Sequence, residues 1–106
     1  MTAMTATRGT THQALADYAV VGLGITGLSC VRYLAARGVS VLAMDSRATP
    51  PNLETVRHEF PEVTVITGAL DADTLSRCRH IVLSPGLSLA EPAIAAARAA
   101  GVDVIG

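Results

Sequence analysis

Hydrophobic positions along the chain fall into two alternating kinds of segment. Short, nearly uninterrupted apolar runs are typical of strands that are buried on both faces of a parallel sheet. The stretches between them place apolar residues at helical spacing, as with Leu28, Val31 and Leu34. This alternation predicts five strands, at residues 18–23, 39–44, 63–66, 81–83 and 102–105.

Capping and breaking residues delimit the four helices that the pattern predicts. Glycine after the last turn, proline in the first turn, and asparagine or aspartate just before the first turn are the expected boundary residues. The predicted helices are 24–37 with Gly38 as C-terminal cap, 53–60 between Asn52 and Pro61, a third from Asp71 or Asp73 to about Cys78, and 92–100 between Pro92 and Gly101.

Strands that alternate with helices predict an α/β fold with a Rossmann-like, doubly wound, five-stranded parallel sheet. Right-handed crossovers favour the strand order 3-2-1-4-5. We predict one domain over residues 17–106. Residues 1–16 have no apolar core and only one charge, Arg8, so we expect a disordered leader there. The chain stops directly after the fifth predicted strand, and we expect it to be part of a longer protein.

The first chemical signal is a glycine motif between the first strand and the first helix. It reads Gly22-Leu-Gly24-Ile-Thr-Gly27. Gly22 permits a tight turn, Gly24 lets a phosphate approach the backbone, and Gly27 lets the helix pack closely on the sheet. Free N–H groups and the helix dipole favour an anion at such a helix start. The alternative is that the glycines serve helix–strand packing alone.

The second signal is Asp45-Ser46-Arg47, at the end of the second predicted strand. In NAD enzymes an acid at this place binds the adenosine ribose diol. Arg47, two residues later, fits NAD poorly and would suggest NADP if the acid were missing. The alternative for Asp45 is a capped strand end or a surface turn. We expect its carboxylate to be solvated, so that substitution would leave stability almost unaltered.

The third signal is Ser84-Pro85-Gly86, directly after the fourth predicted strand. In a sheet of order 3-2-1-4-5, the loops after strands one and four flank the crevice where ligands bind. Pro85 holds Ser84 extended, which predicts that the Ser84 hydroxyl points into that crevice. Gly86 leaves room for a ligand and can adopt positive φ. The alternative is an ordinary turn between a strand and a helix.

Composition narrows the class of partner and chemistry. The formal net charge is −1, so nothing favours nucleic acid or an anionic membrane surface. No apolar run is long enough to span a bilayer. Lysine is absent from all 106 residues. The two cysteines, Cys30 and Cys78, both fall in predicted helices, and we expect them to be reduced thiols without a metal, as in a cytoplasmic protein.

Taken together, the three motifs resemble the N-terminal domain of the D-glutamate-adding Mur ligases, over about residues 18–106. The resemblance implies that the domain binds the UDP part of UDP-N-acetylmuramoyl-L-alanine and no nicotinamide cofactor. Ser46 stands where family members often carry threonine, and both keep the hydroxyl. The resemblance implies that phosphate binds at the helix start, which comprises Gly24, Ile25, Thr26 and Gly27. It implies that Asp45 and Ser46 bind the uracil edge and that Arg47 lies over the uracil face. It also implies that the opposite wall, near the diphosphate, is lined by Ser84, Pro85 and Gly86.

For the whole protein, the resemblance implies an ATP-dependent ligase that adds D-glutamate in cytoplasmic peptidoglycan precursor synthesis. ATP and Mg²⁺ would bind in a central domain, and D-glutamate in a C-terminal domain. Neither domain is present in this sequence, so we expect this chain to hold no cofactor, to be inactive alone and to be a monomer. The main alternative is an NAD(P)-binding module of an oxidoreductase or of a potassium-channel regulatory domain. A non-catalytic interaction domain with a vestigial site is a third possibility.

Overall fold

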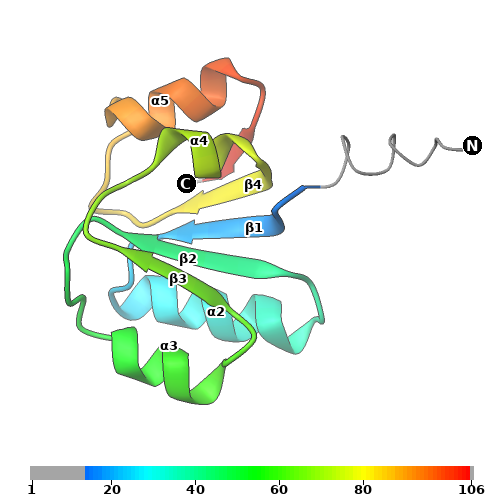
Figure 1. Cartoon of the computed structure of the whole chain (residues 1–106), viewed down its shortest axis with the longest axis vertical. Helices are drawn as coiled ribbons and strands as arrows, with labels where there is room; N and C mark the ends of the chain where they lie inside the picture. The colour runs from blue at the N-terminus through cyan, green and yellow to red at the C-terminus, as the bar shows by residue number, and fades with distance from the viewer. Residues whose placement is uncertain (1–13, 106) are drawn as a thin grey trace, which may run out of the picture.

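A five-stranded, all-parallel sheet forms the centre of the molecule in the computed structural model, which describes residues 14–105 (Figure 1). The strand order is β3-β2-β1-β4-β5. The predicted fold class and strand order are therefore confirmed. The elements are β1 (Ala16–Val21), α2 (Ile25–Ala36), β2 (Val41–Asp45), α3 (Leu53–Glu59), β3 (Thr64–Thr67), α4 (Ala72–Ser76), β4 (Cys78–Leu83), α5 (Pro92–Ala99) and β5 (Asp103–Ile105).

Helices cover both faces of the sheet, and each face has its own hydrophobic core (Figure 1). Successive strand residues point to opposite faces, so β1 contributes to both cores. Val20 packs with Val31 of α2 and Val56 of α3, whereas Val21 packs with Ile94 of α5. All five of these side chains are at most 1 % exposed. This two-sided burial explains why the strands read as apolar runs.

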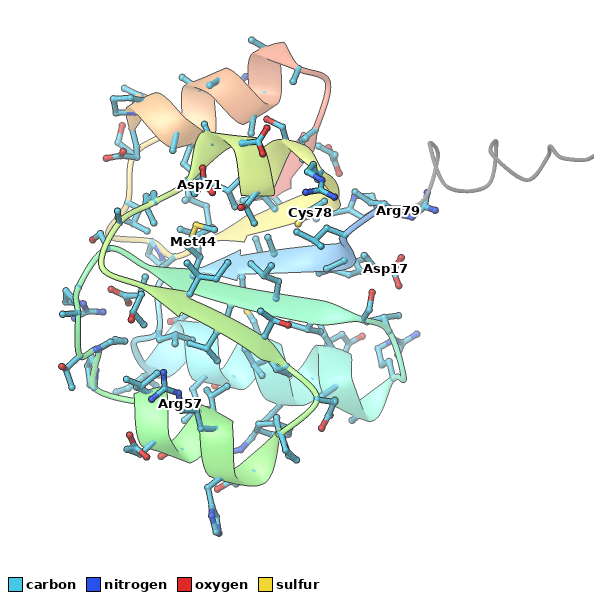
Figure 2. The ribbon with its side chains drawn as sticks, viewed as in Figure 1. Asp17, Met44, Arg57, Asp71, Cys78 and Arg79 are labelled. Atoms are coloured by element: carbon cyan, nitrogen blue, oxygen red, sulfur yellow. The ribbon has the colours of Figure 1, made fainter. Side chains whose placement is uncertain are left out.

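The fourth strand begins earlier than predicted. Cys78, expected at the end of a helix, is the first residue of β4 and pairs with Ala16. The hydrophobic pattern did not predict this part of the strand, because the polar residues Arg79 and His80 interrupt the apolar run. Arg79 lies beside Asp17 of β1, with Nε 3.3 Å from Oδ1 (Figure 2), and His80 stacks on Tyr18 with 4.9 Å between ring centroids.

Both cysteines are free thiols in the structure. Cys30 is half-buried on α2, as expected for a helical residue. Cys78 is buried, and that burial raises the pKa of its thiol. The correction to the helix boundary therefore also moves Cys78 from the end of a predicted helix to a strand residue in the hydrophobic core.

The start of the domain also differs from the prediction. Residues 1–13, most of the predicted leader, lie outside the described residues. Ala16 is the first residue of β1 and is buried, and the Leu15 N–H donates to the Arg77 carbonyl at 2.7 Å. The sheet thus includes the last residue of the segment that we expected to be a leader. Across residues 14–105, no helix is both long and apolar enough to cross a membrane.

Candidate functional site

A crevice of about 490 Å³ lies where the carboxyl ends of β1, β2 and β4 meet. This is the topological switch point of the sheet, where strands stop being added on one side of β1 and are added on the other. Open α/β sheets bind ligands at this point. Its volume falls within the range of small-molecule sites. Every predicted site residue except Gly27 lines it; the lining residues are Gly22, Gly24, Ile25, Thr26, Asp45, Ser46, Arg47, Ser84, Pro85, Gly86 and Leu87.

Two glycines of the motif allow close approach of backbone segments. Gly22 has φ +99°, and a Cβ there would lie 2.5 Å from Ser84 Oγ. A Cβ on Gly27 would lie 1.8 Å from the Gly22 carbonyl oxygen. Gly27 is buried behind the crevice, where it allows α2 to pack against the β1–α2 turn. The predicted packing role of Gly27 is confirmed, and its position keeps it from lining the crevice.

The amino terminus of α2 opens onto the crevice. Gly24 is the N-cap residue, and no side chain within the described residues caps this helix end. Leu28 N–H is the first to bond back, to Gly24 O at 2.9 Å. The N–H groups before it have no partner within the helix, as at any helix start. Ile25 is 85 % exposed at the same place. This end of α2 therefore has the donors and the dipole that an anion requires.

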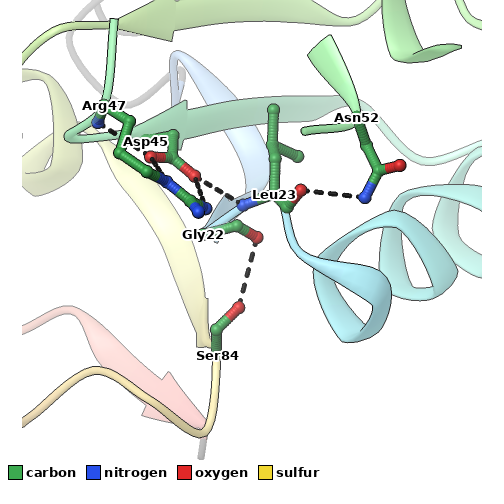
Figure 3. Close-up of polar contacts among 6 residues, drawn as sticks. All are labelled: Gly22, Leu23, Asp45, Arg47, Asn52 and Ser84. Atoms are coloured by element: carbon green, nitrogen blue, oxygen red, sulfur yellow. Dashed lines mark hydrogen bonds and ion pairs between the residues drawn. The ribbon is translucent and has the colours of Figure 1, made fainter. Parts of the chain in front are cut away.

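Asp45 is the one polar residue in the buried set of the described chain, at 3 % exposure. Its carboxylate accepts four hydrogen bonds (Figure 3). Oδ2 accepts from Leu23 N–H and Arg47 Nη2, both at 2.8 Å, and Oδ1 accepts from Arg47 N–H at 2.8 Å and Nε at 2.9 Å. The expectation of a solvated carboxylate was wrong, because the β1–α2 turn and Arg47 enclose it.

The same contacts shift the pKa values of Asp45 and Arg47. The hydrogen bond from the Arg47 guanidinium lowers the pKa of Asp45 to about 2, against the opposing effect of burial, and the Leu23 N–H adds to the lowering. The pKa of Arg47 is raised in return by Asp45. The Arg47 side chain is 55 % exposed, so its guanidinium forms part of the crevice wall while it holds the carboxylate.

Ser84 and Gly86 both line the crevice, and the Ser84 hydroxyl does not lie as predicted. The Ser84 hydroxyl donates to the Gly22 carbonyl at 3.2 Å (Figure 3), so it fastens β4 to the glycine turn and does not project freely into the crevice. Leu87 N–H donates to Ser84 O at 3.0 Å, which closes the turn. Gly86 does not use positive φ. A Cβ on Gly86 would meet nothing within 4 Å, in agreement with an open wall.

Asn52 makes a contact that the sequence did not predict. Its Nδ2 donates to the Leu23 carbonyl at 3.0 Å (Figure 3). Although Asn52 occupies the N-cap position of α3, its side chain forms no cap hydrogen bond there. Asp71, by contrast, caps α4 as expected by accepting from Asp73 N–H. In the sequence, Asn52 was marked only by its predicted N-cap position directly after Pro50 and Pro51.

Comparison with known proteins shows which family this chain resembles. The model of the Mur ligase MurD-like N-terminal domain matches residues 16–106. Proteins named UDP-N-acetylmuramoylalanine–D-glutamate ligase are similar: that of Nitrosococcus oceani is 45 % identical over 94 residues, and that of Pseudomonas fluorescens is 51 % identical over 87. These matches cover 89 % and 82 % of the chain but 21 % and 19 % of the relatives. The chain thus spans about a fifth of their length.

A solved structure shares the fold. It is a chorismate mutase/shikimate 5-dehydrogenase fusion protein from Clostridium acetobutylicum, which superposes with a TM-score of 0.51 at 13 % identity. The match covers 93 % of this chain and 44 % of that one. At this identity the likeness shows the doubly wound architecture alone. The family match, which spans the whole sheet and the crevice, is more specific: the chain belongs to the family of MurD-like N-terminal domains of Mur ligases.

Proposed function

We propose that this domain binds the UDP part of UDP-N-acetylmuramoyl-L-alanine in the crevice at the carboxyl ends of β1, β2 and β4. In the whole protein it would anchor that substrate for a cytoplasmic, ATP-dependent ligase that adds D-glutamate during peptidoglycan precursor synthesis. The observation that carries the proposal is the gathering of a helix start and the Asp45-Ser46-Arg47 triplet around one crevice. The family and its ligase relatives support it.

The diphosphate would lie at the start of α2. Gly24, Ile25 and Thr26 line the crevice there, and their N–H groups belong to the uncapped first turn. Pro85 and Gly86 form the facing wall and are exposed. Net negative charge on the ligand is favoured by the helix dipole and by the neighbouring guanidinium.

The uracil would lie beside the triplet. Ser46 is exposed, and its hydroxyl forms no hydrogen bond with other residues of the described chain, so it is free to donate to a uracil carbonyl. The Arg47 guanidinium is planar and suits stacking over the ring. Asp45 accepts four hydrogen bonds already, so it can accept the uracil N3–H only if Arg47 releases one carboxylate oxygen. Binding would then move Arg47 from Asp45 onto the ring face.

A titration tests the proposal. The chain is titrated with UDP-N-acetylmuramoyl-L-alanine, UDP, ADP and NAD, and binding is measured by calorimetry and by amide chemical shifts. We expect both uridine nucleotides to bind more tightly than ADP or NAD. Ser46→Ala should lower UDP affinity by about tenfold, the value of one lost hydrogen bond, and leave ADP affinity unchanged. Ser29→Ala, an exposed serine of α2 outside the crevice, is the matched control. Tighter binding of NAD than of UDP would replace this proposal with the dinucleotide alternative.

A further inference from the structure

We infer that Asn52 is a positioning residue for the phosphate-binding turn, an inference that rests on the proposed function and adds a residue outside its crevice. Asn52 is not among the residues that line the crevice. It acts on the ligand through the Leu23–Gly24 peptide, whose carbonyl oxygen it holds.

The turn is held by side chains from three separate segments. Asp45 at the end of β2 accepts from Leu23 N–H, Ser84 after β4 donates to Gly22 O, and Asn52 before α3 donates to Leu23 O (Figure 3). Gly22 N–H adds a backbone bond to Met44 O at 2.7 Å. The backbone N–H and C=O groups of both residues are thereby paired, which fixes the turn immediately before the free donors of α2 begin.

The Asn52 bond controls the orientation of the next donor. The C=O and N–H of a trans peptide point in opposite directions, and no cis peptide occurs among the described residues. Holding Leu23 O on Asn52 therefore directs Gly24 N–H to the other side of that peptide, where Gly24 lines the crevice. Gly24 itself gives no resistance to rotation, because a Cβ there would meet nothing within 4 Å. Without Asn52 the peptide can turn over and present a carbonyl oxygen to the phosphate.

The local geometry of Asn52 supports this role over a capping role. Asparagine is among the best N-cap residues, because its side-chain oxygen can accept a hydrogen bond from an N–H in the first turn of the helix. Asn52 occupies that position on α3, yet its side chain is directed to a residue 29 positions away. The Asn52 carbonyl accepts the first intrahelical bond from Val56 N–H at 3.0 Å, as any N-cap carbonyl does, so this bond does not replace a side-chain cap. The side chain thus serves the turn after β1.

The test uses Asn52→Asp. Aspartate is isosteric and is an equally good N-cap that also suits the helix dipole, but it has no N–H to donate to Leu23 O. If Asn52 positions the turn, Asn52→Asp keeps or raises the melting temperature of the chain while its affinity for UDP and for inorganic pyrophosphate falls by about tenfold. The affinity for uridine, which has no phosphate, should be unchanged.

Asp71→Asn is the matched control, since it makes the reverse change at the exposed N-cap of α4, where the side chain does cap the helix. It should leave UDP affinity unchanged. A UDP affinity of Asn52→Asp within twofold of the wild type would overturn the inference.

A second measurement on the ligand-free chain separates this inference from the proposed function. Amide chemical shifts and hydrogen exchange of Gly24, Ile25 and Thr26 should change in Asn52→Asp and stay unchanged in Asp71→Asn. If the wild type binds no UDP, the proposed function fails, and altered amides at the α2 start would still support the positioning role. Unaltered amides would overturn it.

Discussion

At the scale of single residues, the Asp45 carboxylate is the most constrained polar group of the described chain. It is 3 % exposed, and all of its hydrogen-bond partners come from the β1–α2 turn and from Arg47. A buried charge is tolerated only when it is paired and hydrogen-bonded, as this one is. Asp45 therefore has a structural role in the free protein, whatever it contributes to a bound base.

We expect Asp45→Asn to destabilise the fold. The amide has one acceptor oxygen, and its NH₂ group would face the N–H donors that now bind the carboxylate. The free energy of unfolding should fall by about 1–3 kcal/mol, the cost of leaving buried donors unsatisfied. Urea unfolding at pH 7 measures the change. Glu59→Gln is the control, because its pair with Arg32 is exposed on both sides and should contribute less than about 1 kcal/mol. Equal, small effects of the two substitutions would contradict the enclosed geometry.

Stability should also fall in acid through the same carboxylate. The pKa of Asp45 is about 2 in the folded chain, below the ordinary value of 3.8 for an aspartate side chain. The unfolded state therefore binds the proton first, so the stabilisation is fully present above about pH 4 and is lost as the pH falls through about 2. The shift corresponds to about 2 kcal/mol. Urea unfolding between pH 5 and pH 2 should show that the wild type loses more stability than Asp45→Asn. Parallel pH profiles for the two proteins would refute this.

At the scale of elements, the contact between α2 and the β1–α2 turn depends on two glycines. Gly27, in the first turn of α2, faces the Gly22 carbonyl so closely that a methyl group has no room. The approach brings the helix start to the carboxyl end of β1, which is where the crevice opens. The same packing that joins the helix to the sheet thus also places the donors of the helix start.

We expect Gly27→Ala to move α2 away from the turn. The new Cβ would lie 1.8 Å from Gly22 O, which is backbone and cannot rotate aside. Overpacking of this kind costs about 1–3 kcal/mol, and the shift should also weaken UDP binding. Gly86→Ala, where a Cβ meets nothing within 4 Å, should stay within about 0.5 kcal/mol of the wild type. Thermal melting of both variants is the measurement; a fully stable Gly27→Ala would show that α2 can move without cost.

At the scale of the whole molecule, the amino-acid composition bears on whether the chain can use ATP. Phosphoryl transfer in P-loop enzymes uses a lysine that reaches the β- and γ-phosphates. The 106-residue sequence contains no lysine. If the start of α2 binds phosphate groups as proposed, we therefore expect it to bind them without activating them.

We accordingly expect the chain to release no phosphate from ATP and to form no amide bond by itself. A colorimetric phosphate assay with ATP and Mg²⁺ should give the same rate as a blank without protein. Thr26→Ala, a change at the α2 start, is the control that separates contamination from activity of this site. Hydrolysis above background that disappears in Thr26→Ala would disprove the expectation.

The sequence by itself determined the order of strands and helices, the strand order of the sheet and the edge at which the crevice lies. These follow from local signals: apolar runs for buried strands, glycines where the φ is positive or space is absent, and the right-handed crossover that leaves few topologies. Gly22, Gly27 and Gly38 are examples in which the residue type alone specified the conformation or packing that the structure shows. The crevice residues could be predicted because each lies at, or shortly after, the carboxyl end of a strand.

Only the tertiary structure decided what the polar side chains of the site bind. Asp45 meets Leu23 across 22 positions, Asn52 meets the same residue across 29, and Ser84 meets Gly22 across 62. The early start of β4 likewise depends on pairing with β1, because Arg79 and His80 conceal it in the sequence. Local pattern specifies backbone conformation, which is set by near neighbours along the chain. A side-chain hydrogen bond depends on strand register and on distances of a few ångströms, which exist only once the sheet has formed.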